Sequence, residues 1–268
     1  MPILGINYDN CINCRTCIKT CTRLLFNETE KDVILFQDPL NICNLCGHCI
    51  ASCPEDAILY EDVGEAYSFE GVNNPEIIVH YDHIYKFLTA HRSIRRFKKE
   101  KVANDVLKKI FDAMQCAPTG RNMRSESYAI LSDDDQIMAL SDAVQDEISK
   151  TDGLKEIYAD RLAKAKKVLK SPIFFDAPHV IFVSSRFDNE IEAYNIGIII
   201  TYGRLAAQAL GLGTCWNGFT QLAMGLNPAI KKMAGVRGKK FGVFIVGYPD
   251  MTFHRTAPRS KKPIKGLE

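Results

Sequence analysis

Two runs of cysteines constrain this chain more than any other feature. The first run has the spacing C-x2-C-x2-C-x3-C, and the same spacing returns 32 residues later (43 minus 11). The runs are Cys11, Cys14, Cys17, Cys21 and Cys43, Cys46, Cys49, Cys53. Short β-like runs flank them at "LGINY", "VILF" and "AILY". Eight of the ten cysteines therefore lie in the first 53 residues, in a repeat that points to a sulfur-ligated group.

The spacing indicates two [4Fe–4S] clusters. Such a cluster takes four thiolates around one small cube, and a C-x2-C-x2-C loop can supply three of them. In the bacterial two-cluster run the fourth cysteine of each motif ligates the other cluster. Pro54 follows the last cysteine as that run expects, whereas Thr22 follows the first one. The two predicted ligand sets are Cys11, Cys14, Cys17 with Cys53, and Cys43, Cys46, Cys49 with Cys21.

Zinc sites and disulfides are the alternatives. Zinc sites usually pair C-x2-C units across a longer gap, which two repeated C-x2-C-x2-C runs fit poorly. The opening "MPILGINYDN" lacks a basic and an apolar signal region, so we expect the cytoplasm, where disulfides are rare. The segment resembles bacterial two-cluster ferredoxins over roughly its first 55 residues. Cys116 and Cys215, outside the runs, read as structural thiols.

Charge and composition divide the chain. Residues 1–60 carry 4 Lys or Arg against 7 Asp or Glu, a net of −3, which leaves +5 for the rest of a chain with net charge +2. The stretch 61–75 is acidic, contains Gly and Asn, and has no clear period. We therefore expect an iron–sulfur domain at 1–60, a linker at 61–81 and a larger domain at 82–268.

The larger segment alternates helical and strand patterns. Helices are predicted at 82–91, 103–117, within 133–170 and at 189–211. Strands are predicted at 127–132, 179–185 and 240–249. The apolar stretch 195–213 is interrupted by polar residues and makes a poor membrane span. The pattern predicts an α+β domain with a mixed sheet.

Two basic stretches bear on function. "HRSIRRFKKEK" at 91–101 and "HRTAPRSKKPIK" at 254–265 combine Arg with Ser or Thr, which suits a phosphate group. Two solvated charged faces are the simpler interpretation. Nucleic acid is not expected, because the stretches lack interleaved aromatic residues and the net charge of +2 is small.

Four segments in this order resemble the nitroreductase-like FMN enzymes over roughly residues 82–265. They are "HRSIRRF", "APTGRNMRSESYAIL", "LGLGTCWNGF" and "GYPDMTFHRTAPRSKKP". The resemblance implies a mixed α/β sandwich that binds FMN, with a long helix at the centre of a homodimer. His91 stands where the family usually has Arg, and Asn217-Gly218 where many members have Glu-Gly. The implied FMN contacts are His91, Arg92, Ser93, Arg95, Asn122, Asn217, Gly218, Arg255, Arg259 and Lys261.

These features together predict a flavin-dependent oxidoreductase with no catalytic side chain of its own. Clusters would pass electrons singly to FMN, which would reduce a small acceptor such as a nitroaromatic, quinone or enone. The donor would be an external ferredoxin or NAD(P)H, although no G-x-G-x-x-G follows a predicted strand. The alternative is an electron-transfer module for a partner protein, docked through the acidic first segment.

Overall fold

The computed structural model describes residues 3–266. The chain divides into two compact units. One runs to Ile78 and includes Arg121–Met123; the other begins at Val79, omits those three residues and continues from Arg124. No helix among residues 3–266 is both long enough and apolar enough to cross a membrane.

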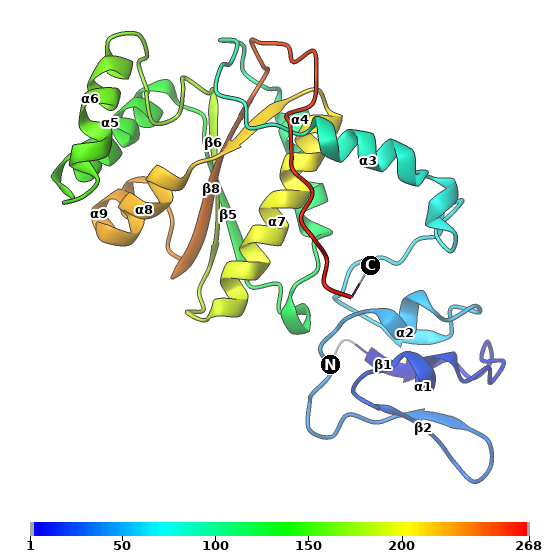
Figure 1. Cartoon of the computed structure of the whole chain (residues 1–268). Coiled ribbons are helices and arrows are strands. Elements are labelled where there is room, and N and C mark those ends of the chain that lie inside the picture. Colours follow the sequence, from blue (N-terminus) through cyan, green and yellow to red (C-terminus); the bar gives the residue numbers. More distant parts are fainter. Residues whose placement is uncertain (1–2, 267–268) are drawn as a thin grey trace. The chain divides into compact units, whose positions relative to one another are not determined.

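The first unit consists of two small antiparallel sheets and two short helices (Figure 1). Strand β1 (Ile3–Ile6) pairs with β4 (Ile58–Tyr60), and β2 (Phe26–Glu28) pairs with β3 (Ile34–Phe36). Helices α1 (Thr16–Thr20) and α2 (His48–Ala51) each begin inside a cysteine run, and η1 (Pro75–Ile77) lies near the end of the unit. The small core of the unit consists of Ile3, Ile6, Cys17, Phe26, Ile34, Ile50, Ala57 and Ile58.

The sequence repeat is also a repeat of backbone conformation. Residues 32 positions apart share a left-handed backbone conformation, which residues other than glycine seldom adopt. The pairs are Asn13 (φ 56°) with Leu45 (φ 54°), Arg15 (φ 62°) with Gly47 (φ 72°), and Leu24 (φ 55°) with Asp56 (φ 48°). The two halves of this unit are therefore copies of one turn-and-helix motif.

The second unit is built on one four-stranded sheet. Its strands are β5 (Glu126–Leu131), β6 (His179–Ser185), β7 (Gly213–Trp216) and β8 (Lys240–Gly247), in the order β5-β6-β8-β7. All three strand pairs are antiparallel, and a parallel bridge between Ser93 and Thr214 extends the β7 edge. The sheet is thus mixed only through this bridge.

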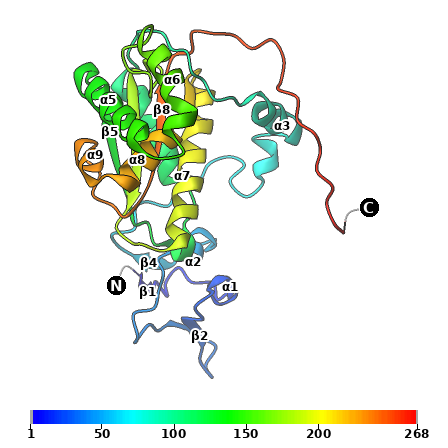
Figure 2. The same ribbon diagram turned by 60° about the vertical axis from the view of Figure 1, so that its left-hand side comes forward.

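Helices cover both faces of the sheet in the second unit (Figure 2). On one face Val180 and Phe182 pack with α5, α8 and α9; on the other, Ile181 and Val183 pack with α4 and α7. The alternation along β6 follows from the two-residue period of a strand. The helices are α3 (Tyr81–Ala90), α4 (Asn104–Gln115), α5 (Asp134–Lys150), α6 (Lys155–Lys166), α7 (Glu190–Ala209), α8 (Gly218–Leu226) and α9 (Pro228–Met233), with a 3-10 turn η2 at Gly120–Asn122.

The expected fold class is confirmed, with differences in detail. The helical region 133–170 is two helices, because Gly153 at φ 78° lies in the turn between α5 and α6. Strand β7 and helices α8 and α9 were not predicted. They lie in "GTCWNGFTQLAMGLNPAIKKM", whose short apolar runs carry no period long enough to separate strand from helix.

Candidate functional site

Two hollows in the first unit are lined by cysteine sulfur. The first hollow is lined by Cys11, Cys14, Cys17 and Cys53 together with residues that include Ile6, Arg15 and Glu55. The second hollow is lined by Cys21, Cys43, Cys46 and Cys49 together with residues that include Arg23, Leu25 and Phe26. The cysteines that share a hollow are the four that the sequence assigns to one cluster.

The donor chemistry of the hollows fits a cluster of several irons. All eight cysteines are free thiols. Within residues 3–266, no three His, Cys, Asp or Glu side chains converge closely enough to hold a single metal ion. Four sulfurs spread around a hollow suit a cubane cluster, in which each thiolate binds a different iron, better than one zinc ion that all four would have to reach.

Burial and hydrogen bonds act differently on the thiols. Burial raises the pKa of Cys49 to about 11. A hydrogen bond with Thr16 lowers the pKa of Cys14, whose Sγ lies 3.3 Å from Thr16 Oγ1. Because iron binds thiolates, loading either hollow must release protons, most of all from the buried sulfurs.

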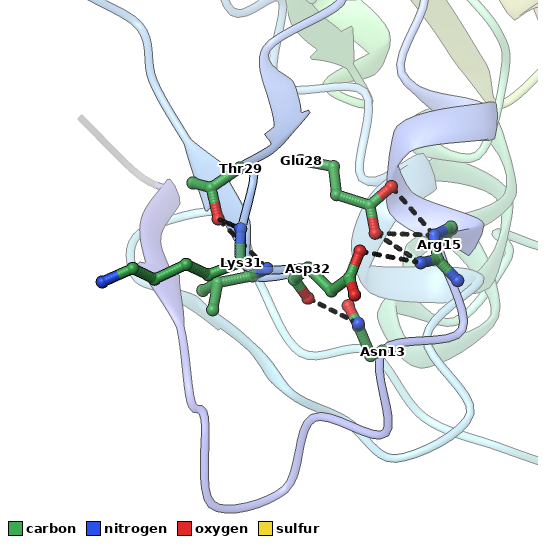
Figure 3. A network of polar contacts seen from close by, with 7 residues as sticks. Asn13, Arg15, Glu28, Thr29, Lys31 and Asp32 are labelled. Atoms are coloured by element: carbon green, nitrogen blue, oxygen red, sulfur yellow. Dashed lines mark hydrogen bonds and ion pairs between the residues drawn. The ribbon is translucent and has the colours of Figure 1, made fainter.

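A polar network fixes the first cysteine loop to the β2–β3 hairpin (Figure 3). The Arg15 Nε donates to both carboxylate oxygens of Glu28, at 2.8 and 2.9 Å, and its Nη2 lies 3.8 Å from Asp32 Oδ1. Asn13 Nδ2 donates to the Asp32 carbonyl at 2.6 Å. The network is exposed, so solvent and salt weaken its ion pairs, and its role is to fix the position of the loop.

In the second cysteine loop a buried carboxylate, that of Asp38, fixes the main chain. Asp38 is 5% exposed. Its Oδ1 accepts from the Ile42 amide at 2.8 Å, and its Oδ2 accepts from the Cys43 amide at 2.9 Å. These two bonds fix the start of the cysteine run.

In the second unit, main-chain bonds hold the segment "HRSIRRF" along the sheet edge. The Ile94 amide donates to the Thr214 carbonyl at 2.9 Å beside the Ser93–Thr214 bridge. The Lys98 amide donates to the Tyr248 carbonyl at 2.9 Å. The predicted contacts Arg92, Ser93 and Arg95 are therefore fixed between β7 and the end of β8.

Positive charge gathers at the start of this segment. His91 Nδ1 lies 2.5 Å from Gln208 Oε1, and Gln208 Nε2 donates to the Phe87 carbonyl at 2.7 Å. Burial lowers the pKa of His91; the nearby charges of Arg204, Arg92 and Arg259 lower it further, while the Gln208 bond opposes them. His91 is thus a neutral residue at pH 7 in cationic surroundings.

Arg204 is part of this cationic surface, although sequence reasoning did not select it. It projects from α7, and its Nε donates to Thr214 Oγ1 at 3.2 Å. Burial lowers the pKa of Arg204, and the charge of Arg95 adds to this effect. The available signal was the pair Arg204 and Gln208, polar residues four apart in the mostly apolar second half of the helix.

The cations of this surface have no anionic partner within the described part of the chain. Every ion pair found in residues 3–266 involves other side chains. Arg95 lies 5.9 Å above the Phe175 ring, and Arg92 Nη1 donates to the Thr89 carbonyl at 2.8 Å. Arginines that make no ion pair fit an anionic ligand group such as a phosphate.

The other predicted contacts lie in different settings. Arg255, Arg259 and Lys261 are exposed in the extended stretch after β8. Asn217 is buried and caps α8: its Oδ1 accepts from the Thr220 amide and its Nδ2 donates to the Ile173 carbonyl.

Gly218 and Asn122 are the last two of the predicted FMN contacts. A Cβ at Gly218 would meet nothing within 4 Å, so the main chain there is open to a flat ligand. Asn122 belongs to the three residues grouped with the first unit, where its Nδ2 donates to the carbonyls of Asn44 (3.2 Å) and Leu45 (2.8 Å). Its side chain is therefore already engaged.

Comparisons with known proteins agree with both parts of this description. Residues 10–58 match the family model of the 4Fe-4S dicluster domain. The chain is 36% identical over 55 residues to an NADPH-dependent oxidoreductase of Staphylococcus aureus (strain MRSA252), a match that covers 20% of this chain and 21% of that protein. This relative therefore bears on one segment alone.

Solved structures share the fold of the second unit. A nitroreductase with bound FMN from Bacteroides fragilis superposes with a TM-score of 0.54 at 18% identity, over 69% of this chain and 96% of its own. An FMN-dependent nitroreductase from Clostridium difficile R20291 gives 0.55 at 19% identity, over 68% and 97%. Residues 88–248, about three fifths of the chain, match the nitroreductase family model. The chain therefore belongs to the nitroreductase family and carries a 4Fe-4S dicluster domain ahead of its nitroreductase segment.

Proposed function

We infer that this protein is a flavin-dependent oxidoreductase fed by iron–sulfur clusters. Two [4Fe–4S] clusters pass electrons to FMN, and the flavin reduces a small acceptor such as a nitroaromatic, quinone or enone. The observation that carries this proposal is one chain with two four-sulfur hollows and, on a nitroreductase fold, a cationic surface whose arginines make no ion pair among the described residues.

The clusters are assigned to the two hollows. Cys11, Cys14, Cys17 and Cys53 hold one cluster, and Cys21, Cys43, Cys46 and Cys49 hold the other. Each cluster carries one electron at a time, so the pair supplies the two electrons that a two-electron acceptor needs. All eight thiols are free, which agrees with a reducing compartment such as the cytoplasm.

The FMN phosphate is assigned to the cationic surface formed by Arg92, Ser93, Arg95, Arg204 and Arg259. A planar guanidinium gives a phosphate two parallel hydrogen bonds, and a serine hydroxyl adds one more. Neutral His91 uses its one N–H on Gln208 Oε1, so it is proposed to orient the start of this segment beside the phosphate without adding charge. Bound FMN supplies the conversion between single electrons and a hydride.

The other proposed contacts with the flavin are the exposed main chain at Gly218 and several residues named by the family resemblance. Gly218 presents unobstructed backbone at the start of α8, beside Asn217. Asn122, Arg255 and Lys261 remain proposed contacts on the family resemblance alone.

Electrons enter from an external ferredoxin or from NAD(P)H. The Staphylococcus aureus relative is NADPH-dependent, which supports the nicotinamide route. The acidic first segment, with a net charge of −3 (4 basic against 7 acidic residues), supports docking of a basic protein donor.

The proposal includes a homodimer. Helix α7 exposes an apolar stripe of Ile191 (51%), Tyr194 (67%), Ile198 (39%) and Tyr202 (40%) at helical spacing. A shallow depression lies along this stripe, lined by Ala193, Tyr194, Gly197, Ile198, Thr201 and Tyr202. A second copy of the chain would cover such a face.

Anaerobic purification followed by a cofactor assay and a screen of donors and acceptors tests the function. We expect bound FMN, iron and sulfide, and turnover with small acceptors. A protein whose reduced form is reoxidised by a partner protein and by no small molecule would instead be an electron-transfer module.

The phosphate assignment makes a further prediction. Arg95→Ala should weaken FMN binding by about 1–3 kcal/mol, the value of a hydrogen bond to a charged group. Fluorescence titration of the apoprotein with FMN measures it. Arg186→Ala, an exposed arginine on the same unit, is the matched control, and equal affinities in both variants would refute the assignment.

A further inference from the structure

The repeat in the first unit allows the two cluster sites to be compared position by position. Residues 32 positions apart occupy equivalent places, because the cysteine spacing and the left-handed backbone positions coincide. Three equivalent pairs differ in character: Ile6 with Asp38, Thr16 with His48, and Arg15 with Gly47. Reduction potentials of such clusters depend on nearby charge, hydrogen bonds to sulfur and solvent exposure.

The first difference is one buried charge. Asp38 is 5% exposed and its carboxylate accepts the amide of Cys43 at 2.9 Å. The equivalent residue in the other half, Ile6, lines the first hollow with an apolar side chain. Reduction adds a negative charge to a cluster, so a buried carboxylate beside the second hollow opposes it.

The second difference lies in the hydrogen bonds to sulfur. Thr16 Oγ1 lies 3.3 Å from Cys14 Sγ and can donate to the thiolate, whereas the equivalent His48 has no bond to Cys46 within the described residues. The Ala57 amide donates to Cys53 Sγ at 3.2 Å, and the equivalent bond from Leu25 to Cys21 measures 3.5 Å. Hydrogen-bond donors to sulfur stabilise the reduced cluster. Both comparisons therefore favour reduction of the cluster in the first hollow.

Exposure of the ligands does not separate the two hollows. In the first, Cys14 is exposed but Cys17 is buried, and in the second all four sulfur ligands are half-buried. The buried charge and the hydrogen bonds to sulfur therefore distinguish the two sites.

The remaining charges near the hollows are at the surface. Arg15 and Glu55 line the first hollow, and Arg23 lines the second; all three side chains are exposed. Arg15 is moreover paired with Glu28 at 2.8 Å. Solvent and salt screen these charges, so the buried charge of Asp38 dominates.

We propose that Asp38 gives the cluster of Cys21, Cys43, Cys46 and Cys49 a lower reduction potential than the cluster of Cys11, Cys14, Cys17 and Cys53. An external one-electron reductant then places the first electron on the latter cluster and the second electron on the former. No bond forms or breaks, and each cluster takes up one electron. This inference rests on the cluster part of the proposed function and not on the flavin part.

A redox titration of the full-length holoprotein, followed by electron paramagnetic resonance, tests the proposal. We expect two separate one-electron transitions. Asp38→Asn keeps the side-chain size and removes the charge. The reduction potential of the lower transition should therefore rise by about 59 mV, a tenfold change in the equilibrium constant, while that of the upper transition stays unchanged. Asp9→Asn, an exposed carboxylate two residues before Cys11, is the matched control and should shift either transition less.

A second variant keeps the test decisive if Asp38→Asn fails to assemble both clusters. Thr16→Val removes the hydroxyl beside Cys14 and should lower the upper transition alone. Overlapping transitions in the wild-type protein, an Asp38→Asn shift of the upper transition, or an unchanged upper transition in Thr16→Val would each overturn the proposal. Because the cluster signals are recorded independently of flavin reduction, a failure of the electron relay to FMN would appear separately.

Discussion

The two units assemble their candidate sites in different ways. In the first, six of the eight sulfur ligands come from two local loops, and the other two are lent between halves of a repeat. In the second, the cationic surface depends on residues far apart in the chain, such as His91 and Gln208, which are 117 positions apart.

This difference determines how far the effect of a substitution extends. In the first unit a substitution of one cysteine removes one ligand and leaves the rest of the molecule unchanged. A surface held between β7, α7 and the end of β8 changes whenever their packing shifts. Substitutions in the first unit should therefore act on one cluster, whereas those in the second should couple stability with cofactor binding.

The largest expected effect is the loss of a cluster from Cys53→Ala. Cys53 lines the hollow of Cys11, Cys14 and Cys17, so that cluster should be lost and the iron content should fall from about eight to about four per chain. FMN should be retained. Iron and flavin assays measure both quantities.

The control for this prediction is Cys116→Ala, which changes an exposed cysteine outside the repeat. It should leave the iron content unchanged. Loss of FMN from Cys53→Ala with iron retained would show that the two sites are not separable.

Gly213→Ala probes the packing of the second unit. A Cβ at Gly213 would lie 2.6 Å from Ile94 Cγ1, so the segment that carries Arg92 and Arg95 must move. We expect a loss of about 1–3 kcal/mol in the free energy of unfolding, together with weaker FMN binding. Denaturant unfolding and FMN titration measure the two effects.

Gly225→Ala is the matched substitution. It lies in α8 with nothing within 4 Å of its added Cβ, and it should stabilise the protein by about 0.5–1 kcal/mol. If both variants behave alike, close packing at Gly213 does not position the cationic segment.

Arg204→Gln tests the residue that the sequence did not reveal. Loss of the guanidinium should weaken FMN binding by about 1–3 kcal/mol. Arg204→Lys keeps the charge but loses the Nε bond to Thr214, so its affinity should lie between those of wild type and Arg204→Gln. If Arg204→Gln binds FMN as tightly as the wild-type protein does, Arg204 does not contact the phosphate.

The smallest effect concerns acid stability of the second unit. Burial lowers the pKa of His179 to about 4, and its Nε2 accepts the Val102 amide at 3.0 Å. The unfolded chain therefore binds a proton that the folded chain does not, and stability should fall as the pH drops from about 6.5 towards 4. Unfolding midpoints across this range measure it.

His179→Gln should flatten that pH dependence, whereas His83→Gln, at an exposed position, should not. A wild-type protein whose stability stays constant between pH 6.5 and pH 4 would contradict a buried neutral His179.

The sequence revealed the sites to the extent that they are local. The cysteine spacing predicted two sets of four ligands once it was compared with the bacterial two-cluster run, in which the fourth cysteine of each motif ligates the other cluster. Family resemblance reached the "HRSIRRF" segment, whose residues are contiguous.

The other residues were beyond a reading of the sequence, for physical reasons. Arg204, Gln208 and Thr214 meet His91 and Ser93 only once α7 and β7 pack together. The spacing of Arg204 and Gln208 on one helix face is a weak local signal, and Thr214 has none. Asn217 was predicted as a flavin contact, yet both ends of its buried amide serve to cap α8 and hold Ile173, a task that depends on tertiary packing.

The central claim is that the clusters supply the flavin with electrons. The most direct test compares wild-type protein with Cys53→Ala, both loaded with FMN, in anaerobic turnover of a quinone with reduced ferredoxin as the donor. We expect the variant to lose turnover by at least about tenfold, because one of the two one-electron carriers is missing. Equal turnover per flavin in the two proteins would contradict it.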